Sequence, residues 1–409
     1  PLRAFVICLI AYTTAQMDLA LFGYAVPAIR AEFGLTLSEV MAIVSSAFLL
    51  GGALLVVLGW LADRVGRLPL FQFSLLGSSL LVALISIAPG VATLTALRGA
   101  SIAVGGLSYP ITGAIITEEM PARLRGLFMG LLQIGYPLGW ALASLWSMCL
   151  LTEHGWRQLF WVGLVSLPMV WVVRRYLREP PRSVAARSAE SPPRFSDLFA
   201  TGVRERAITL FIAQFLFGWA YAASIFLFPS FLREVRALDA FNFSMLIGAG
   251  NAIGALGYAL AAWIGERVWT RRNTVVLWTL LGALLFQALV WVPTSFGQIL
   301  LVYALMSMFF YGSAAVKFAY LAEVFPTRIR TLAMACCGSL AVTLGSAVGP
   351  YTVSLAIESW GWHLGYATLV GVPLALAGLL YLNLDSLPSG LEVEDIVNRI
   401  GREAQASHG

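Results

Sequence analysis

Three ionisable residues stand inside long apolar stretches of this 409-residue chain, where a charge is costly. Asp18 interrupts the first such stretch, Arg98 the fourth and Lys317 the tenth. Ionisable side chains inside a membrane are rare, and they usually carry protons, bind ions or hold a charged ligand. The 26 lysines and arginines of the sequence include Lys317 as the single lysine. These three residues are therefore the first candidates for chemistry.

Asp18 and Arg98 are expected to lie at similar depths. At a rise of about 1.5 Å per residue, Asp18 lies about 22 Å and Arg98 about 28 Å from the same end of their helices. A carboxyl group in a dry site takes up a proton readily and a neighbouring arginine opposes this, whereas the guanidinium keeps its own proton. We predict that Asp18 carries a proton and that Arg98 gates it and also contacts an anionic ligand. A static ion pair is the alternative.

Lys317 lies six residues before Glu323, which places it about 9 Å from the end of its helix. A lone ammonium there suits an anionic group of a ligand, with Tyr311 and Tyr320 beside it. Two alternatives stay open, because the side chain can also snorkel toward lipid headgroups or pair with Glu323.

Other polar and aromatic residues are candidates to face a cavity between helices, although tyrosine and tryptophan also form interfacial belts in membranes. Tyr109-Pro110 and Gly135-Tyr136-Pro137 are expected to loosen their helices. The small residues from Gly345 to Pro350 permit close helix packing and bending. The cavity candidates are Tyr24, Tyr109, Gln133, Tyr136, Gln214, Trp219, Tyr221, Asn251 and Tyr311.

The composition predicts the elements that must position these residues. Apolar residues make up 59% of the chain and charged residues 11%, with a mean hydropathy of +0.82, whereas soluble domains have roughly 45–50% and about 25%. A membrane-spanning helix needs about 20 apolar residues. We expect an all-α polytopic membrane protein with twelve transmembrane helices, at 4–27, 39–61, 68–88, 91–117, 125–151, 157–177, 207–232, 241–265, 273–293, 296–322, 331–357 and 362–384.

The cations predict the orientation of these helices, since lysine and arginine collect on the cytoplasmic side of short loops. Of the 26, 20 fall at the chain ends and in the even-numbered gaps between helices, so both termini are expected in the cytoplasm. The net charge of +5 follows from topology and implies no nucleic-acid partner. The expected domains are two six-helix bundles at 1–177 and 207–384, a cytoplasmic linker at 178–206 rich in Arg, Pro and Ser, and a cytoplasmic tail at 385–409.

Two loop signatures recur after roughly 200 residues. The segment Gly59–Arg67 is matched by Gly265–Arg272, and Glu118–Arg125 is matched by Glu323–Arg330. The chain is therefore interpreted as a tandem duplication of a six-helix unit. Duplicated bundles of this kind bind their substrate between the halves, near the middle of the bilayer.

These motifs resemble the major facilitator superfamily of transporters over essentially the whole chain. Gly59–Arg67 matches the family's loop between helices 2 and 3, and Arg98 with Gly105 and Gly106 resembles its helix 4 signature. Met17–Pro27 is similar to the first helix of the aromatic acid:proton symporters and related organic-acid carriers, with Asp18 kept and Ala15 in place of a second aspartate. The resemblance implies a cytoplasmic gate made of Gly59, Asp63, Arg64, Gly66, Arg67, Glu118, Arg123, Arg125, Glu266, Arg267, Glu323, Arg328 and Arg330.

The expected function is proton-coupled symport of a small organic anion, an aromatic or other monocarboxylate, by alternating access. A proton-coupled drug or metabolite exporter and a facilitator for a neutral nutrient are the alternatives.

An enzyme is not expected, because no nucleophile cluster and no phosphate-binding loop with a lysine is present. The four cysteines lie in apolar runs without metal-site spacing. We expect no metal and no cofactor other than the coupling proton. The expected form is a monomer in the bacterial cytoplasmic membrane, with lipid and a small-molecule substrate as partners.

Overall fold

The fold is described from a computed structural model, which covers residues 2–65, 67–121, 124–153, 155–177, 198–199, 203–325, 329 and 332–386. For residues 55–65, 67, 109–110, 114, 117–118, 125, 152–153 and 322–323, the backbone alone is described. All regular structure in these residues is helical, and twelve of the described segments are long and apolar enough to cross a membrane. The expected all-α fold with twelve spans is confirmed.

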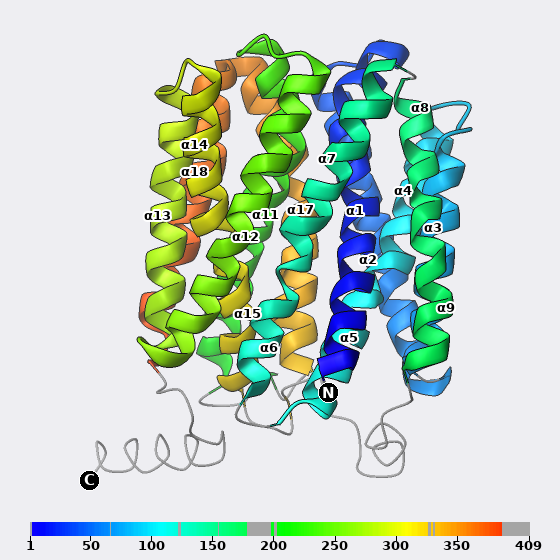
Figure 1. The fold of residues 1–409 in the computed structure, drawn as a ribbon. Helices are drawn as coiled ribbons and strands as arrows, with labels where there is room; N and C mark the ends of the chain where they lie inside the picture. The colour runs from blue at the N-terminus through cyan, green and yellow to red at the C-terminus, as the bar shows by residue number, and fades with distance from the viewer. Residues whose placement is uncertain are drawn as a thin grey trace.

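The N-terminal half, defined here as residues 2–177, stands beside the C-terminal half, residues 203–386 (Figure 1). The helices of the N-terminal half are α1 (Leu2–Phe33), α2 (Leu37–Val65), α3 (Arg67–Ile85), α4 (Val91–Gly106), α5 (Ser108–Glu119), α6 (Arg125–Leu132), α7 (Gly135–Glu153), α8 (Trp156–Leu159), η2 (Phe160–Ser166) and α9 (Leu167–Tyr176). Those of the C-terminal half are α11 (Arg204–Glu234), α12 (Ala240–Arg267), α13 (Arg271–Trp291), α14 (Phe296–Met306), η4 (Ser307–Tyr311), α15 (Ser313–Glu323), η5 (Met334–Leu340), α17 (Ala341–Trp360), α18 (Trp362–Leu380) and η6 (Tyr381–Asn383).

Small residues bring the two halves into close contact. Between the halves, α7 packs along α12, and α2 packs along α17. The hydroxyls of Ser147 on α7 and Ser244 on α12 are 2.8 Å apart, and a methyl group at Gly248 would collide with Ser144. Such contacts replace the hydrophobic driving force that is missing between helices in lipid.

Several spans are interrupted, which changes the direction of the side chains that follow. A turn at Leu107 separates α4 from α5, and residues 133–134 separate α6 from α7, so the weak points predicted near Tyr109-Pro110 and Gly135-Tyr136-Pro137 are confirmed. The π-helical segments η4 and η5, in the tenth and eleventh spans, were not expected. In α17, Gly345 and Gly349 lie against the backbone of α11 with no room for a side chain, as the small-residue face predicted.

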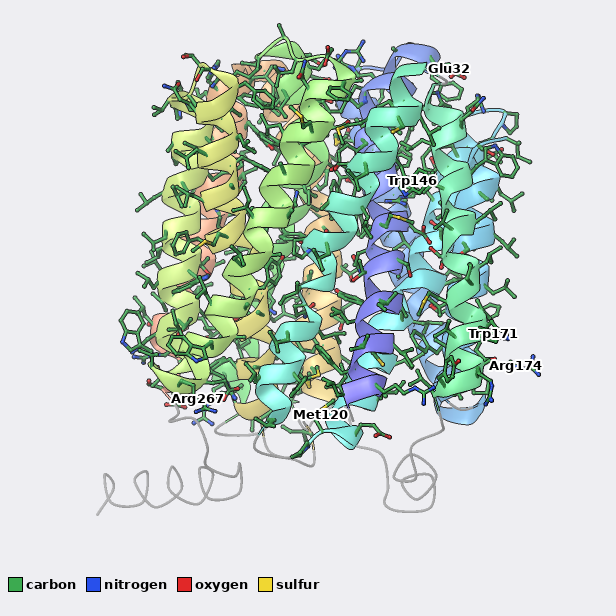
Figure 2. All side chains as sticks on the ribbon, in the orientation of Figure 1. Glu32, Met120, Trp146, Trp171, Arg174 and Arg267 are labelled. Carbon is green, nitrogen blue, oxygen red and sulfur yellow. The ribbon has the colours of Figure 1, made fainter. Side chains whose placement is uncertain are left out.

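The charged residues mark the two ends of the bundle (Figure 2). Glu32 lies at the upper end in this view, whereas Arg174 and Arg267 lie at the lower end, the end at which α1 begins. At the upper end Arg30 of α1 forms an ion pair with Glu234 of α11, and Trp362 Nε1 donates a 3.1 Å hydrogen bond to Glu234. The upper ends of the two halves are therefore linked by charge.

Replacing Glu234 by Gln should weaken this link and open the upper end slightly. The side chains of Arg30 and Glu234 are 29% and 38% exposed, so the pair is worth at most about 1 kcal/mol and the shift should be small. Distances between spin labels attached in place of Ala31 and Phe241, measured by electron paramagnetic resonance, would show this opening as a larger fraction of molecules with the longer distance. Glu32→Gln is the matched control, because Glu32 pairs with Arg157 inside the same half. Equal shifts in both variants would contradict a link between halves.

Candidate functional site

A cavity of about 180 Å³ lies inside the N-terminal half, where α17 of the C-terminal half closes against it. Asp18 of α1 and Arg98 of α4, predicted to be neighbours from their depths alone, both line it. The other polar side chains in its wall are Gln16, Ser78, Ser101, Ser108 and Thr343. The cavity therefore offers one carboxyl group, one guanidinium and several neutral hydrogen-bonding groups.

Asp18 is 3% exposed, and its carboxyl group has one hydrogen-bonding partner among the residues that the structure describes. Ser166 Oγ, at the end of η2, lies 3.3 Å from each carboxylate oxygen and donates to them. Sequence reasoning missed Ser166, because a lone serine in an apolar span carries no signal of its own. A carboxyl group with one hydroxyl donor and little water is stable only with help from nearby positive charge or with a bound proton.

Arg98 is 2% exposed and is anchored on α1. Its Nη2 donates a 2.7 Å hydrogen bond to the carbonyl oxygen of Leu19, and its guanidinium carbon lies 4.8 Å from the ring centre of Phe22. Arg98 and Asp18 interact electrostatically, but no nitrogen–oxygen contact of 4.0 Å or less joins them in the described structure. The direct ion pair that was the alternative to a proton site is therefore not formed here. The guanidinium is held beside the cavity with no carboxylate of the described side chains in contact.

Lys317 lies elsewhere, in α15, and is not part of the cavity wall. It is 2% exposed, and its Nζ lies 3.3 Å above the ring centre of Phe217. This nitrogen has no hydrogen-bond partner among the described residues. Snorkelling would place the ammonium in water or among lipid headgroups. The burial of Lys317 is evidence against that alternative. Pairing with Glu323 stays open, because the side chain of Glu323 is not described.

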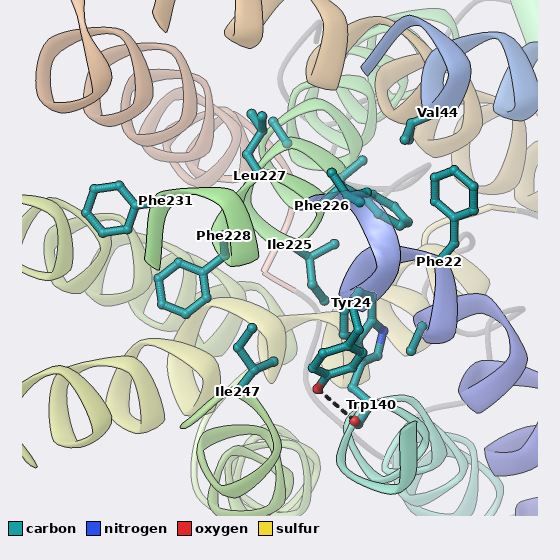
Figure 3. Close-up of a cluster of buried hydrophobic side chains, with 14 of the residues drawn as sticks. Phe22, Tyr24, Val44, Trp140, Ile225, Phe226, Leu227, Phe228, Phe231 and Ile247 are labelled. Carbon is teal, nitrogen blue, oxygen red and sulfur yellow. Dashed lines mark hydrogen bonds between the residues drawn. The ribbon is translucent and has the colours of Figure 1, made fainter. Parts of the chain in front are cut away.

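Several aromatic candidates form a layer between the two halves. Tyr24 donates a 3.0 Å hydrogen bond to the carbonyl oxygen of Trp140 (Figure 3), and Trp140 also lies near Phe226 of the other half, at 5.9 Å between ring centres. Tyr136 and Tyr221 extend the layer across the halves at 5.3 Å. Trp140, which sequence reasoning missed, is fully buried and its Nε1 has no partner in the described structure. These rings pack across the interface between the two halves.

The remaining polar candidates have partners in the protein and do not line the cavity. Each of those with a described side chain makes a hydrogen bond, although Oδ1 of Asn251 is buried without a partner among the described residues. For Tyr109 only the backbone is described. The bonds are Tyr12 to Gln133 at 3.2 Å, Tyr381 to Gln214 at 3.4 Å, Trp219 to Leu369 O at 2.9 Å, Asn251 to Tyr303 at 2.8 Å, Tyr311 with Ser224 at 3.1 Å and Tyr320 to Asp385 O at 2.8 Å.

The predicted cytoplasmic gate falls mostly where the structure gives no side chains. Glu266 is described: it forms an ion pair with Arg271 and packs against Gly126 of the other half, while Arg267 is exposed. The gate therefore stays a prediction. Gly66, Arg123, Arg328 and Arg330 lie outside the described residues, and only the backbone is described for Gly59, Asp63, Arg64, Arg67, Glu118, Arg125 and Glu323.

Comparison with known proteins places the chain among transporters. The model of the family described as Major Facilitator Superfamily matches residues 8–271 and 210–396. The chain is 26% identical to a probable 4-methylmuconolactone transporter of Cupriavidus pinatubonensis, over 90% of this chain and 86% of the relative. It is 26% identical to the cis,cis-muconate transport protein of Acinetobacter baylyi, over 92% of each chain, and 25% identical to a gentisate transporter of Corynebacterium glutamicum, over 85% and 79%.

A solved structure shares the fold. It is a bacterial homologue of the human lysosomal transporter Spinster in an inward-facing and occupied conformation. The TM-score is 0.71 with 15% sequence identity, over 93% of this chain and 95% of that one.

Proposed function

Because the chain belongs to the Major Facilitator Superfamily, and is thus an integral membrane transport protein, we propose that it is a proton-coupled symporter for small organic acid anions. The relatives named for muconate and gentisate support the substrate class. The observation that carries the proposal is the burial of Asp18 and Arg98 in one cavity. We propose a bacterial cytoplasmic membrane with both termini inside, supported by the 20 cations on the inner side of the predicted topology.

Arg98 binds the carboxylate of the substrate. A guanidinium is planar, always charged and matches a carboxylate with two parallel hydrogen bonds. Nη2 is engaged by Leu19, which fixes the position of the group, and no carboxylate among the described residues is in contact with it. Preorganisation of this kind improves affinity, because the side chain loses little freedom on binding.

Asp18 couples the proton to the anion. An ionised Asp18 and a substrate carboxylate compete for the same positive field of Arg98. Protonation of Asp18 removes its negative charge, so the anion binds better, and by linkage the bound anion favours protonation. Release of both on the other side follows when the halves rock and water reaches the cavity. Alternating access of this type moves one bundle against the other around a fixed site.

Uptake into proteoliposomes tests the proposal. A panel of aromatic and short aliphatic carboxylates, a sugar and a cationic drug would be offered with and without an inward proton gradient. Gradient-driven accumulation of a carboxylate is the expected result. Proton-driven movement of the cationic drug in the opposite direction would favour an exporter, and gradient-independent equilibration of a sugar would favour a facilitator.

Lys317→Ala should raise the apparent Km for anions if the ammonium meets the substrate on its path. The expected rise is about tenfold, since a charge-assisted hydrogen bond is worth about 1.5–3 kcal/mol. Initial uptake rates over a range of carboxylate concentrations measure it, with Lys317→Arg as the control that keeps the charge. An unchanged Km would assign Lys317 to packing on Phe217 alone.

A further inference from the structure

Two polar groups of the cavity wall are left without hydrogen bonds. The three serines there donate to backbone carbonyls three residues earlier in the chain, at 3.3, 2.8 and 2.7 Å. Gln16 and Thr343 make no hydrogen bond to any described residue, and Oε1 of Gln16 is fully buried. An unmade hydrogen bond of a buried atom is costly, so the buried Oε1 of Gln16 is expected to have a partner in a ligand or a water molecule. Thr343 is half-buried and offers its hydroxyl beside the same cavity.

Thr343 also differs from the other threonine of its helix. Thr352 of α17 donates to the carbonyl of Val348 at 2.9 Å, which is how a helical threonine usually satisfies its hydroxyl. Thr343 follows the π-helical segment η5 in the chain. Its hydroxyl makes no hydrogen bond to any residue that the structure describes, and the residue lines the cavity.

Thr343 is the one described cavity residue that comes from the C-terminal half. Its methyl group packs on Gly52 of α2. A Cβ added to this glycine would lie only 2.7 Å from Cγ2 of Thr343. The hydroxyl therefore reaches the cavity only while α17 is docked on α2. A ligand that contacts both Arg98 and Thr343 would hold the two halves together.

We propose that Thr343 and Gln16 bind a second hydrogen-bonding group of the substrate, apart from the carboxylate held by Arg98. This inference rests on the proposed function and narrows it. The transporter selects organic acids that carry a hydroxyl, keto or second carboxyl group over acids with a bare hydrocarbon body. Because one anchor lies in each half, the same contact stabilises the closed arrangement of α2 and α17.

Paired acids with one skeleton test the selection. Uptake of benzoate and of 3- and 4-hydroxybenzoate, and of hexanoate and adipate, would be measured as Km and maximal rate in proteoliposomes. The wild type is expected to prefer one polar member of a pair at least tenfold. Thr343→Val, which keeps the shape and the methyl on Gly52, should reduce that preference about tenfold by raising the Km of the polar member alone. Thr343→Ser keeps the hydroxyl and should keep the preference, and Gln16→Met should act in the same direction as Thr343→Val.

The contact with Gly52 has its own test. Gly52→Ala adds a methyl that pushes Thr343 away, so the polar acids should lose affinity, and Thr343→Ser in the same chain removes the colliding methyl and should restore it. An equal preference in wild type and Thr343→Val, or an equal loss for both members of a pair, overturns the inference while carboxylate uptake stands. If no carboxylate is taken up by the wild type, the proposed function fails and this inference with it.

Discussion

Asp18→Asn is expected to abolish accumulation of a carboxylate driven by an inward proton gradient while leaving exchange measurable. Asparagine has the size of the aspartic acid, and its side-chain oxygen can still accept a hydrogen bond from Ser166. Its amide does not take up or release a proton. With one coupled proton, a gradient of one pH unit supports about tenfold accumulation, since each unit is worth about 1.36 kcal/mol. In the variant the ratio should fall to about one.

The pH dependence gives a second readout for the same variant. In the wild type the apparent affinity for the anion should rise as the pH falls, because protonation of Asp18 removes the competing charge near Arg98. In Asp18→Asn it should be independent of pH. Ser166→Ala is the matched control, because it loses the hydrogen bond and keeps the titrating group. Intact accumulation in Asp18→Asn would assign the proton to another residue.

Arg98→Gln is expected to remove carboxylate transport altogether, in exchange as well as in accumulation. Two charge-assisted hydrogen bonds at about 1.5–3 kcal/mol each correspond to a loss of at least 100-fold in affinity. Arg98→Lys should be intermediate, because an ammonium keeps the charge and loses the planar fork. Exchange of radiolabelled carboxylate in proteoliposomes measures both variants without a gradient.

Two controls separate this effect from misfolding. Arg157→Gln removes an arginine that pairs with Glu32, away from the cavity, and should transport normally. Melting temperature in detergent would report the stability of each variant, since the loss of the bond from Arg98 to Leu19 also affects packing. Carboxylate exchange by Arg98→Gln at wild-type affinity would place the anion site elsewhere, with Lys317 as the next residue to test.

The candidate site was predictable in part. Asp18 and Arg98 stood out because ionisable residues in apolar spans are rare, and the rise of a helix was sufficient to put them at one depth. Depth carries no information on rotation, and residue type alone also made candidates of Lys317 and of tyrosines that do not line the cavity. Ser166, Gln16 and Thr343 were missed, since the sequence does not show which serine, threonine and glutamine residues of the spans face the cavity. Trp140 was missed for the same reason, as one of 13 tryptophans.

The sequence by itself determined the twelve spans and the membership in a superfamily of transporters, because insertion depends on the composition of each segment of about 20 residues. Only the tertiary structure decided which side chains share the cavity. That choice depends on the rotation of each helix, which the turn at Leu107 and the π-helical segments η4 and η5 change, and on how closely small residues such as Gly52 and Gly248 let helices approach. Thr343 meets the Asp18–Arg98 cavity only because α17 packs on α2, a contact between residues nearly 300 positions apart.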